Sequence, residues 1–100
     1  MRPKKTRWVK CVPKERCFKP RCKPLNKLQS VHISLDEFEA IRLADLEELK
    51  QIDAARLMHI SRPTFSRIVA LARKKVADGL VNIKVIQIEG GCCRIKRRRK

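Results

Sequence analysis

The feature of this sequence that most constrains its fold is a long amphipathic segment in the second half of the chain. Ser61 is a favoured N-cap residue, and Pro63 stands in the first turn, where its missing N–H costs nothing. The residues that follow place an apolar side chain on one face at helical spacing, which predicts a helix over about residues 62–78. These residues are Phe65, Ile68, Val69, Ala72 and Val76. Gly79 is expected to end the helix.

Two shorter helical patterns precede this segment. Ser34 and Glu37 have the spacing of a capping box, which predicts a helix over about residues 35–45. A further helix is expected over about residues 50–58, because apolar side chains recur there on one face. They are Ile52, Ala55 and Met58. Since only residues 59–61 separate the last two helices, a tight turn is expected to join them.

A β-branched run follows the helices. Its alternation predicts one strand over about residues 82–89, ahead of a glycine pair. A single strand needs a partner, and the candidates are Val31–Ile33 and Trp8–Val12. We therefore expect a mainly α fold: a three-helix core of the helix-turn-helix type with a small β element and basic, partly flexible N- and C-terminal arms.

The distribution of charge divides the chain into three parts. The formal net charge is +16. Residues 1–27 have eleven Lys and Arg and one acid, residues 28–93 have nine bases and nine acids, and residues 94–100 have six bases and no acid. We expect a basic, Cys- and Pro-rich N-terminal arm (1–27), a helix-turn-helix domain with a C-terminal strand (28–91), and a cysteine pair with a polybasic tail (92–100).

Two basic arms on a small neutral body favour a polyanionic partner, either nucleic acid or an anionic membrane surface. No apolar run approaches the roughly 18 residues that a membrane span needs, and the N-terminus lacks the apolar core of a secretory signal. We therefore expect a cytoplasmic protein with no membrane partner. Charge within the body favours DNA: residues 36–53 have seven acids and two bases, whereas residues 56–75 have six bases and no acid.

Residues 51–68 have the pattern of a helix-turn-helix. Ala55 is small where the two helices cross, Ile60 is apolar in the turn, and Ser61 caps the second helix. The polar and basic residues of that helix then face outward, as in a helix that enters the major groove of duplex DNA. The sequence therefore predicts a double-stranded DNA-binding protein, and a transcriptional regulator in particular.

The chain also resembles a known family. The resemblance rests on four motifs: LDEFEAIRLADLE (35–47), SRPTFSRI (61–68), ARKKVA (72–77) and IEGG (88–91). They are similar to a small prokaryotic family of predicted DNA-binding proteins, domain of unknown function one hundred and thirty-four, and the helical core resembles the fourth region of bacterial sigma factors. The resemblance covers most of the chain and implies a helix-turn-helix fold and DNA binding. His59 departs from it, since the family prefers glycine in this turn, and the polybasic tail and extra cysteines are unusual.

Geometry and resemblance together assign site residues. Base edges are expected to be read from the first turns of the last helix, by Arg62, Thr64, Ser66 and Arg67. Phosphate contacts, which position a protein without specifying sequence, are expected from Gln51, Arg73 and Lys74. Tail residues are expected to add salt-dependent affinity for phosphates, or alternatively to lie in a minor groove. They are Lys96, Arg97, Arg98, Arg99 and Lys100.

Five cysteines allow a second hypothesis. Cys11, Cys17, Cys22, Cys92 and Cys93 all lie in the basic arms. If the arms meet, their thiolates suit zinc or an iron–sulfur cluster. The spacing C-x5-C-x4-C is not the C-x2-C of a zinc finger, and free or redox-labile thiols are the alternative. We therefore expect no cofactor, with a metal site as the other hypothesis.

Other function classes are less well supported. We expect no enzyme, because no phosphate loop, nucleophile elbow or HExxH motif occurs. An RNA- or ribosome-associated module is disfavoured by the lack of aromatic residues for stacking, since only Trp8, Phe18, Phe38 and Phe65 are present. A metal- or redox-sensing regulator stays open. A homodimer also stays open, because symmetric DNA sites require one and the edge of the C-terminal strand could pair with a second copy.

Overall fold

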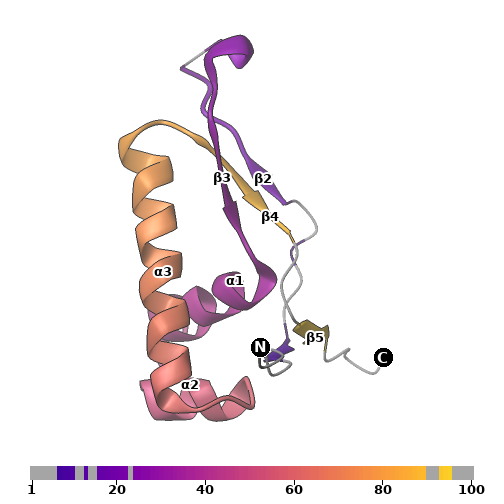
Figure 1. Ribbon diagram of the computed structural model, residues 1–100, viewed down its shortest axis with the longest axis vertical. Helices are drawn as coiled ribbons and strands as arrows, with labels where there is room; N and C mark the ends of the chain where they lie inside the picture. Colours follow the sequence, from indigo (N-terminus) through magenta and orange to yellow (C-terminus); the bar gives the residue numbers. More distant parts are fainter. Residues whose placement is uncertain (1–6, 11–12, 14–15, 23, 90–92, 96–100) are drawn as a thin grey trace, which may run out of the picture.

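The computed structural model describes residues 7–10, 13, 16–22, 24–89 and 93–95, with the backbone alone at position 25 and positions 93–95. Within this part, three helices and a small three-stranded sheet confirm the expected mainly α fold (Figure 1). None of these helices has the length and apolar character that crossing a lipid bilayer requires. The helices are α1 (Leu35–Ile41), α2 (Gln51–Leu57) and α3 (Arg62–Val81), with a 3-10 turn η1 (Leu25–Lys27) and a π-helical turn η2 (Arg42–Leu46). The strands are β1 (Arg7–Val9), β2 (Cys17–Phe18), β3 (Ser30–Ile33), β4 (Val85–Ile88) and β5 (Cys93–Ile95).

The two predicted serine N-caps are confirmed, because the side chain of each serine accepts a hydrogen bond from the first turn of its helix. At α1 the N–H of Ser34 donates to Glu37 Oε1 at 2.9 Å, and the N–H of Glu37 donates to Ser34 Oγ at 3.4 Å, which completes the capping box. At α3 the N–H of Thr64 donates to Ser61 Oγ at 3.3 Å. Glu37 also accepts two hydrogen bonds from Lys75 Nζ, at 2.8 and 3.0 Å, so its carboxylate joins α1 to α3.

The first helix has the predicted extent but not a uniform geometry. After α1 the backbone widens into the π-helical turn η2, where the N–H of Glu47 donates to the carbonyl of Arg42, five residues earlier, at 2.8 Å. Two residues after this turn, Glu48 has a left-handed backbone with a φ of 56°. The chain then reverses and enters α2.

The end of α3 differs from the prediction. Gly79 does not stop the helix, which continues to Val81. Gly79 is buried, and a Cβ atom added there would lie 2.7 Å from Ile86 Cγ1 and 3.3 Å from Val31 Cγ1. The glycine is therefore required for the close approach of α3 to the sheet, whereas the reversal occurs later, at Ile83 with a φ of 53°.

A Gly79→Val substitution tests this close approach. We expect it to lower the free energy of unfolding by about 1–3 kcal/mol, because the added Cβ atom already overlaps the side chain of Ile86. The matched control is Ala77→Val on the exposed face of the same helix, which should cost no more than about 0.7 kcal/mol through helix propensity alone. Urea denaturation of both variants measures the difference. If both variants lose the same free energy of unfolding, the close approach of α3 to the sheet does not require glycine at position 79.

The sheet places β4 in the centre. It pairs with β3 in parallel, from Ser30↔Val85 to Ile33↔Ile88, and with β2 in antiparallel fashion through Phe18↔Ile86. Of the two candidate partners for the C-terminal strand, Val31–Ile33 pairs with it, whereas Trp8 and Val9 pair with β5. Because β4 has a neighbour on each side, however, the expectation that its open edge pairs with a second copy is wrong.

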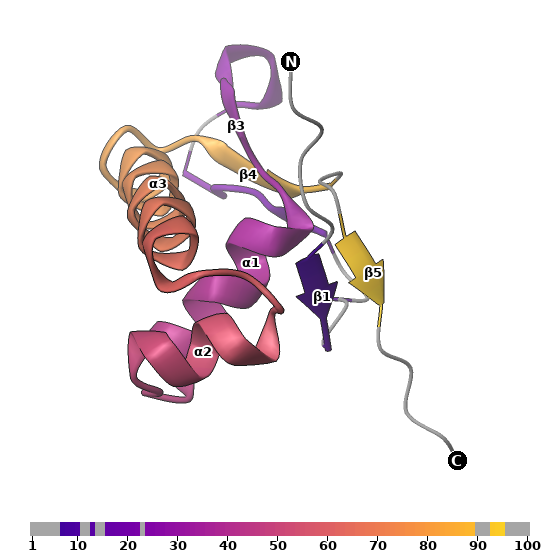
Figure 2. The same cartoon turned by 60° about the horizontal axis from the view of Figure 1, so that its bottom comes forward.

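Two stretches of the N-terminal segment, β1 and β2, belong to the folded body, and β1 overlaps the strand candidate Trp8–Val12. Val9 is completely buried with Ile33 and Ile88. The N–H of Lys10 donates to Glu39 Oε2 at 2.8 Å, so the end of β1 is held against α1. β1 also pairs in parallel with β5, and Figure 2 shows the two strands together at one side of the helices. Apolar residues inside a basic segment thus contribute to the core.

A second cluster of buried residues joins the helices. It is formed by Ala40, Leu43, Ala54, Ala55, Met58, Ile60, Phe65 and Val69. The predicted inner face of α2 is correct for Ala55 and Met58 and wrong for Ile52, whose side chain is 54% exposed. Ala54 replaces it in the core, and these small side chains allow α2 to approach α3 closely.

Candidate nucleic-acid interface

The turn between α2 and α3 determines how the two helices are oriented. It comprises residues 58–61, and two of its side chains, Met58 and Ile60, are buried in the helical core. His59 between them is exposed and has a left-handed backbone with a φ of 58°, a conformation that favours glycine. The N–H of Ile60 donates to the carbonyl of Ala55 at 3.0 Å. The turn is therefore anchored on both sides of a single strained residue.

Strand β1 supports this turn from outside, which the sequence did not predict. The backbone N–H of Trp8 donates to the carbonyl of Met58 at 3.1 Å. The rings of Trp8 and His59 are in contact, with their centroids 4.9 Å apart. An aromatic side chain in a basic N-terminal segment gave no indication of this partner, because 51 positions separate the two residues.

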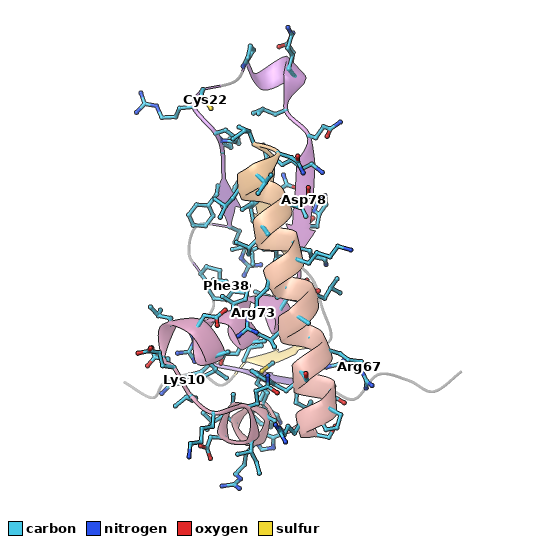
Figure 3. All side chains as sticks on the ribbon, turned by 90° about the vertical axis from the view of Figure 1, so that its left-hand side faces the viewer. Lys10, Cys22, Phe38, Arg67, Arg73 and Asp78 are labelled. Carbon is cyan, nitrogen blue, oxygen red and sulfur yellow. The ribbon has the colours of Figure 1, made fainter. Side chains whose placement is uncertain are left out.

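The predicted base-reading residues lie on the first two turns of α3. Arg62, Ser66 and Arg67 are exposed, and Figure 3 shows Arg67 projecting outward from the helix. Thr64 is half-buried and its Oγ1 accepts a hydrogen bond from Ser61 Oγ at 2.9 Å, so its hydroxyl belongs to the helix cap. Gln51 at the start of α2 shares a shallow depression of about 210 Å³ with Arg62 and Ser66. Side chains from the two helix starts thus line the same depression, together with Pro63.

The predicted phosphate-binding residues of α3 have different surroundings. Lys74 is exposed and lies seven residues, or about two helical turns, after Arg67. Arg73 instead donates from Nε and Nη2 to the carboxylate of Asp45, at 3.1 and 2.7 Å. These hydrogen bonds hold the pKa of Asp45 below its ordinary value. A phosphate contact by Arg73 therefore requires that this ion pair open or that phosphate compete with Asp45.

Comparison with known proteins identifies the family. The model described as "Protein of unknown function DUF134" matches residues 1–96. This chain belongs to the DUF134 family. The resemblance of the motifs to this family is thereby confirmed.

Relatives of this DUF134 chain are named UPF0251 proteins. One from Thermoanaerobacter pseudethanolicus is 51% identical over 94 residues, which are 94% of this chain and 80% of the relative. One from Caldanaerobacter subterraneus is 52% identical over 90 residues, 90% of this chain and 76% of the relative. One from Prosthecochloris aestuarii is 54% identical over 90 residues, 90% of this chain and 58% of the relative. No solved structure matches the chain significantly.

The cysteine hypothesis for this DUF134 protein stays a prediction. Cys17 and Cys22 are exposed free thiols, and Cys93 belongs to β5, where its backbone lies opposite Arg7. Within the described residues, no three His, Cys, Asp or Glu side chains come close enough to hold a metal ion. Cys11 and Cys92 lie outside the described residues, as do the tail positions 96–100 that were assigned to phosphate.

Proposed function

We propose that this protein binds double-stranded DNA, that α2, the turn and α3 act as a helix-turn-helix with α3 in the major groove, and that it regulates transcription. The observation that carries the proposal is that the first turns of α3 have a buried apolar face and an exposed basic face. Phe65 and Val69 are fully buried against the helical core, whereas Arg62 and Arg67 on the same two turns are exposed. A helix held rigidly from behind with a basic N-terminal half in front is the arrangement that reads base edges.

The position of α3 in the molecule supports the same proposal. α3 has 20 residues, so it is about 30 Å long. Its start lies beside α2 and its end beside the sheet (Figure 1). The sheet therefore covers the C-terminal half of α3 and leaves the N-terminal half at the end of the molecule, where a DNA groove has access to it.

Electrostatics add a second argument. The acids of α1 and η2 pair with nearby bases: Glu37 with Lys75, Glu39 with Arg42, and Asp45 with Arg73. In the described part of the chain, no carboxylate lies within ion-pairing distance of Arg62, Arg67 or Lys74. These three side chains are therefore available to an external anion, although the pKa of Asp78 on the same helix is lowered by a hydrogen bond from Lys84 and also, to a smaller extent, by the charge of Lys74. Phosphate oxygens are the anions that a duplex supplies at high density.

Selection of bound duplexes from a random DNA pool at near-physiological salt tests the proposal. The intact chain is compared with a variant in which the five tail residues 96–100 are replaced by glutamine, so that β5 and its pairing with β1 are kept. We expect both proteins to recover the same sequence motif, and structured RNA at matched salt to compete weakly. If no motif is enriched and the glutamine variant no longer binds, the basic tail is responsible for binding and the assignment of α3 is wrong.

Removing the carboxylate that holds Arg73 should increase affinity for DNA. In an Asp45→Asn variant the guanidinium of Arg73 loses its ionic partner and one negative charge leaves that surface. We expect tighter binding to every duplex and a salt dependence steeper by about one unit in the slope of log K against log salt. Titrations at several salt concentrations measure this slope. The double variant Asp45→Asn/Arg73→Gln is the control and should return the slope to its original value; an unchanged slope in the single variant would exclude Arg73 from the interface.

A further inference from the structure

An apolar groove lies between the sheet and the first helix. Its volume is about 370 Å³, and strands, α1, η2 and α3 all contribute to its lining. Its lining is apolar apart from Arg42 and includes Phe18, Phe38, Ile41, Leu46, Val76 and Ile86. Two of them are largely exposed, Phe18 at 64% and Leu46 at 73%. Large apolar side chains that converge on one hollow surface mark an interaction site.

The groove faces away from Arg67 on the proposed DNA-binding surface. Val76 lines the groove and Arg67 precedes it by nine residues, or about two and a half turns of α3, so the two lie on opposite sides of the helix. Figure 3 shows the same separation, with Phe38 and Arg67 on opposite sides of α3. A partner bound in the groove therefore leaves Arg67 accessible.

The two exposed apolar residues have surroundings of opposite charge. Phe18 on β2 is flanked in sequence by Arg16 and Lys19, which are both exposed. Leu46 at the end of η2 is followed by Glu47 and Glu48, which are also exposed. Among the described residues, no ion pair involves Arg16, Lys19 or Glu48, and Glu47 lies 3.9 Å from Arg42 with half of its side chain exposed. The groove thus has a basic region around Phe18 and an excess of acids around Leu46, where the base Arg42 also lines the groove and pairs with Glu39.

We propose that the occupant of this groove is a second copy of the chain, bound about a two-fold axis. A two-fold interface places the same patch of both subunits face to face in opposite directions. The Phe18 region of each copy then meets the Leu46 region of the other, so that base faces acid twice and both apolar side chains are buried. An acidic or a basic partner of another kind would complement only one of the two regions. This dimer forms without DNA, so it goes beyond the proposed function and does not rest on it.

Sedimentation equilibrium of the full chain in the absence of nucleic acid tests the dimer. We expect twice the mass of one chain, and a dissociation constant that is raised at least about tenfold by Leu46→Ser or Phe18→Ser. Leu80→Ser is the matched control, because Leu80 is 67% exposed but does not line the groove. Circular dichroism verifies that each variant is folded. The proposal is overturned if the wild-type chain is monomeric at a concentration of about 100 μM. It is also overturned if Leu80→Ser weakens the dimer as much as the groove variants do.

Charge reversal separates the two-fold arrangement from a general apolar contact. Glu47→Lys/Glu48→Lys should weaken the dimer, as should Arg16→Glu/Lys19→Glu, because each places like charges opposite one another. Combining all four substitutions exchanges the two regions and should restore the association. If the combined variant dissociates as readily as either double variant, the two regions do not face each other and the two-fold arrangement is wrong. None of these measurements uses DNA, so their outcome is independent of whether α3 binds it.

Discussion

Replacing Phe65 by alanine is expected to lower the free energy of unfolding by about 3–5 kcal/mol. The phenylalanine is completely buried and belongs to the cluster in which Met58 and Ile60 of the turn meet Val69 of α3. Its removal leaves a cavity between α2 and α3, and the surrounding backbone cannot collapse into it without shifting the turn. Since a domain of this size is stable by only about 5–15 kcal/mol, the loss is a large fraction of the total.

Urea denaturation followed by far-ultraviolet circular dichroism measures this loss, with an unchanged dependence on denaturant as the sign that the unfolded state is the same. Leu80→Ala is the matched control on the same helix, and because its side chain is largely exposed it should change stability by no more than about 0.5 kcal/mol. A loss below about 1 kcal/mol for Phe65→Ala would show that this residue is not the packing centre of α2 and α3.

The parts of the fold that depend on neighbouring residues could be predicted from the sequence. Ser34 and Ser61 start helices because their side chains bond to an N–H three residues ahead, an interaction contained in four consecutive positions. The apolar stripe of α3 is equally local, since its period alone indicates the buried face. The helix starts and the inner residues of α3 were therefore predicted correctly.

Residues whose role depends on distant segments were predicted less well. Gly79 has the local properties of a helix terminator, but β4 packs so closely against α3 that this position must lack a side chain. Val9 stands in a segment with many bases, yet its side chain is buried in the core beside Ile33 and Ile88. β2 was not predicted at all, because two residues paired to a strand nearly 70 positions away have no periodic pattern.

The candidate site shows the same division. Exposure of Arg62, Ser66 and Arg67 follows from the helical period, because each residue lies away from the apolar stripe. The surroundings of Arg73 do not follow from it: its partner Asp45 is 28 positions away, on a π-helical turn that local preferences did not indicate. The excess of acids over residues 36–53 was the only sign that bases of α3 would find partners there. The helical period can thus identify a base on the outer face of a helix as a candidate for phosphate binding. It cannot show whether a carboxylate from another element already pairs with that base.

Replacing Arg67 by alanine is expected to remove sequence discrimination rather than DNA binding as a whole. If this guanidinium bonds to a guanine edge, its loss costs about 1–3 kcal/mol at the preferred site, and duplexes without that site are bound nearly as before. Competition titrations with the selected duplex and a scrambled duplex measure both affinities at one salt concentration. Comparison with the wild-type protein then gives the change in their ratio, which is the quantity that base reading alters.

Lys74→Ala provides the contrast on the same helix. Its side chain is exposed two turns further along, where it can reach a phosphate but is not expected to reach a base. This variant should weaken binding to both duplexes by the same factor and lower the salt slope by about one unit. Arg67→Ala should change the ratio of the two affinities, and Lys74→Ala should not. If Arg67→Ala instead weakens both duplexes equally, Arg67 contacts the backbone, and α3 lies on the DNA in an orientation that does not direct its first turns into the major groove.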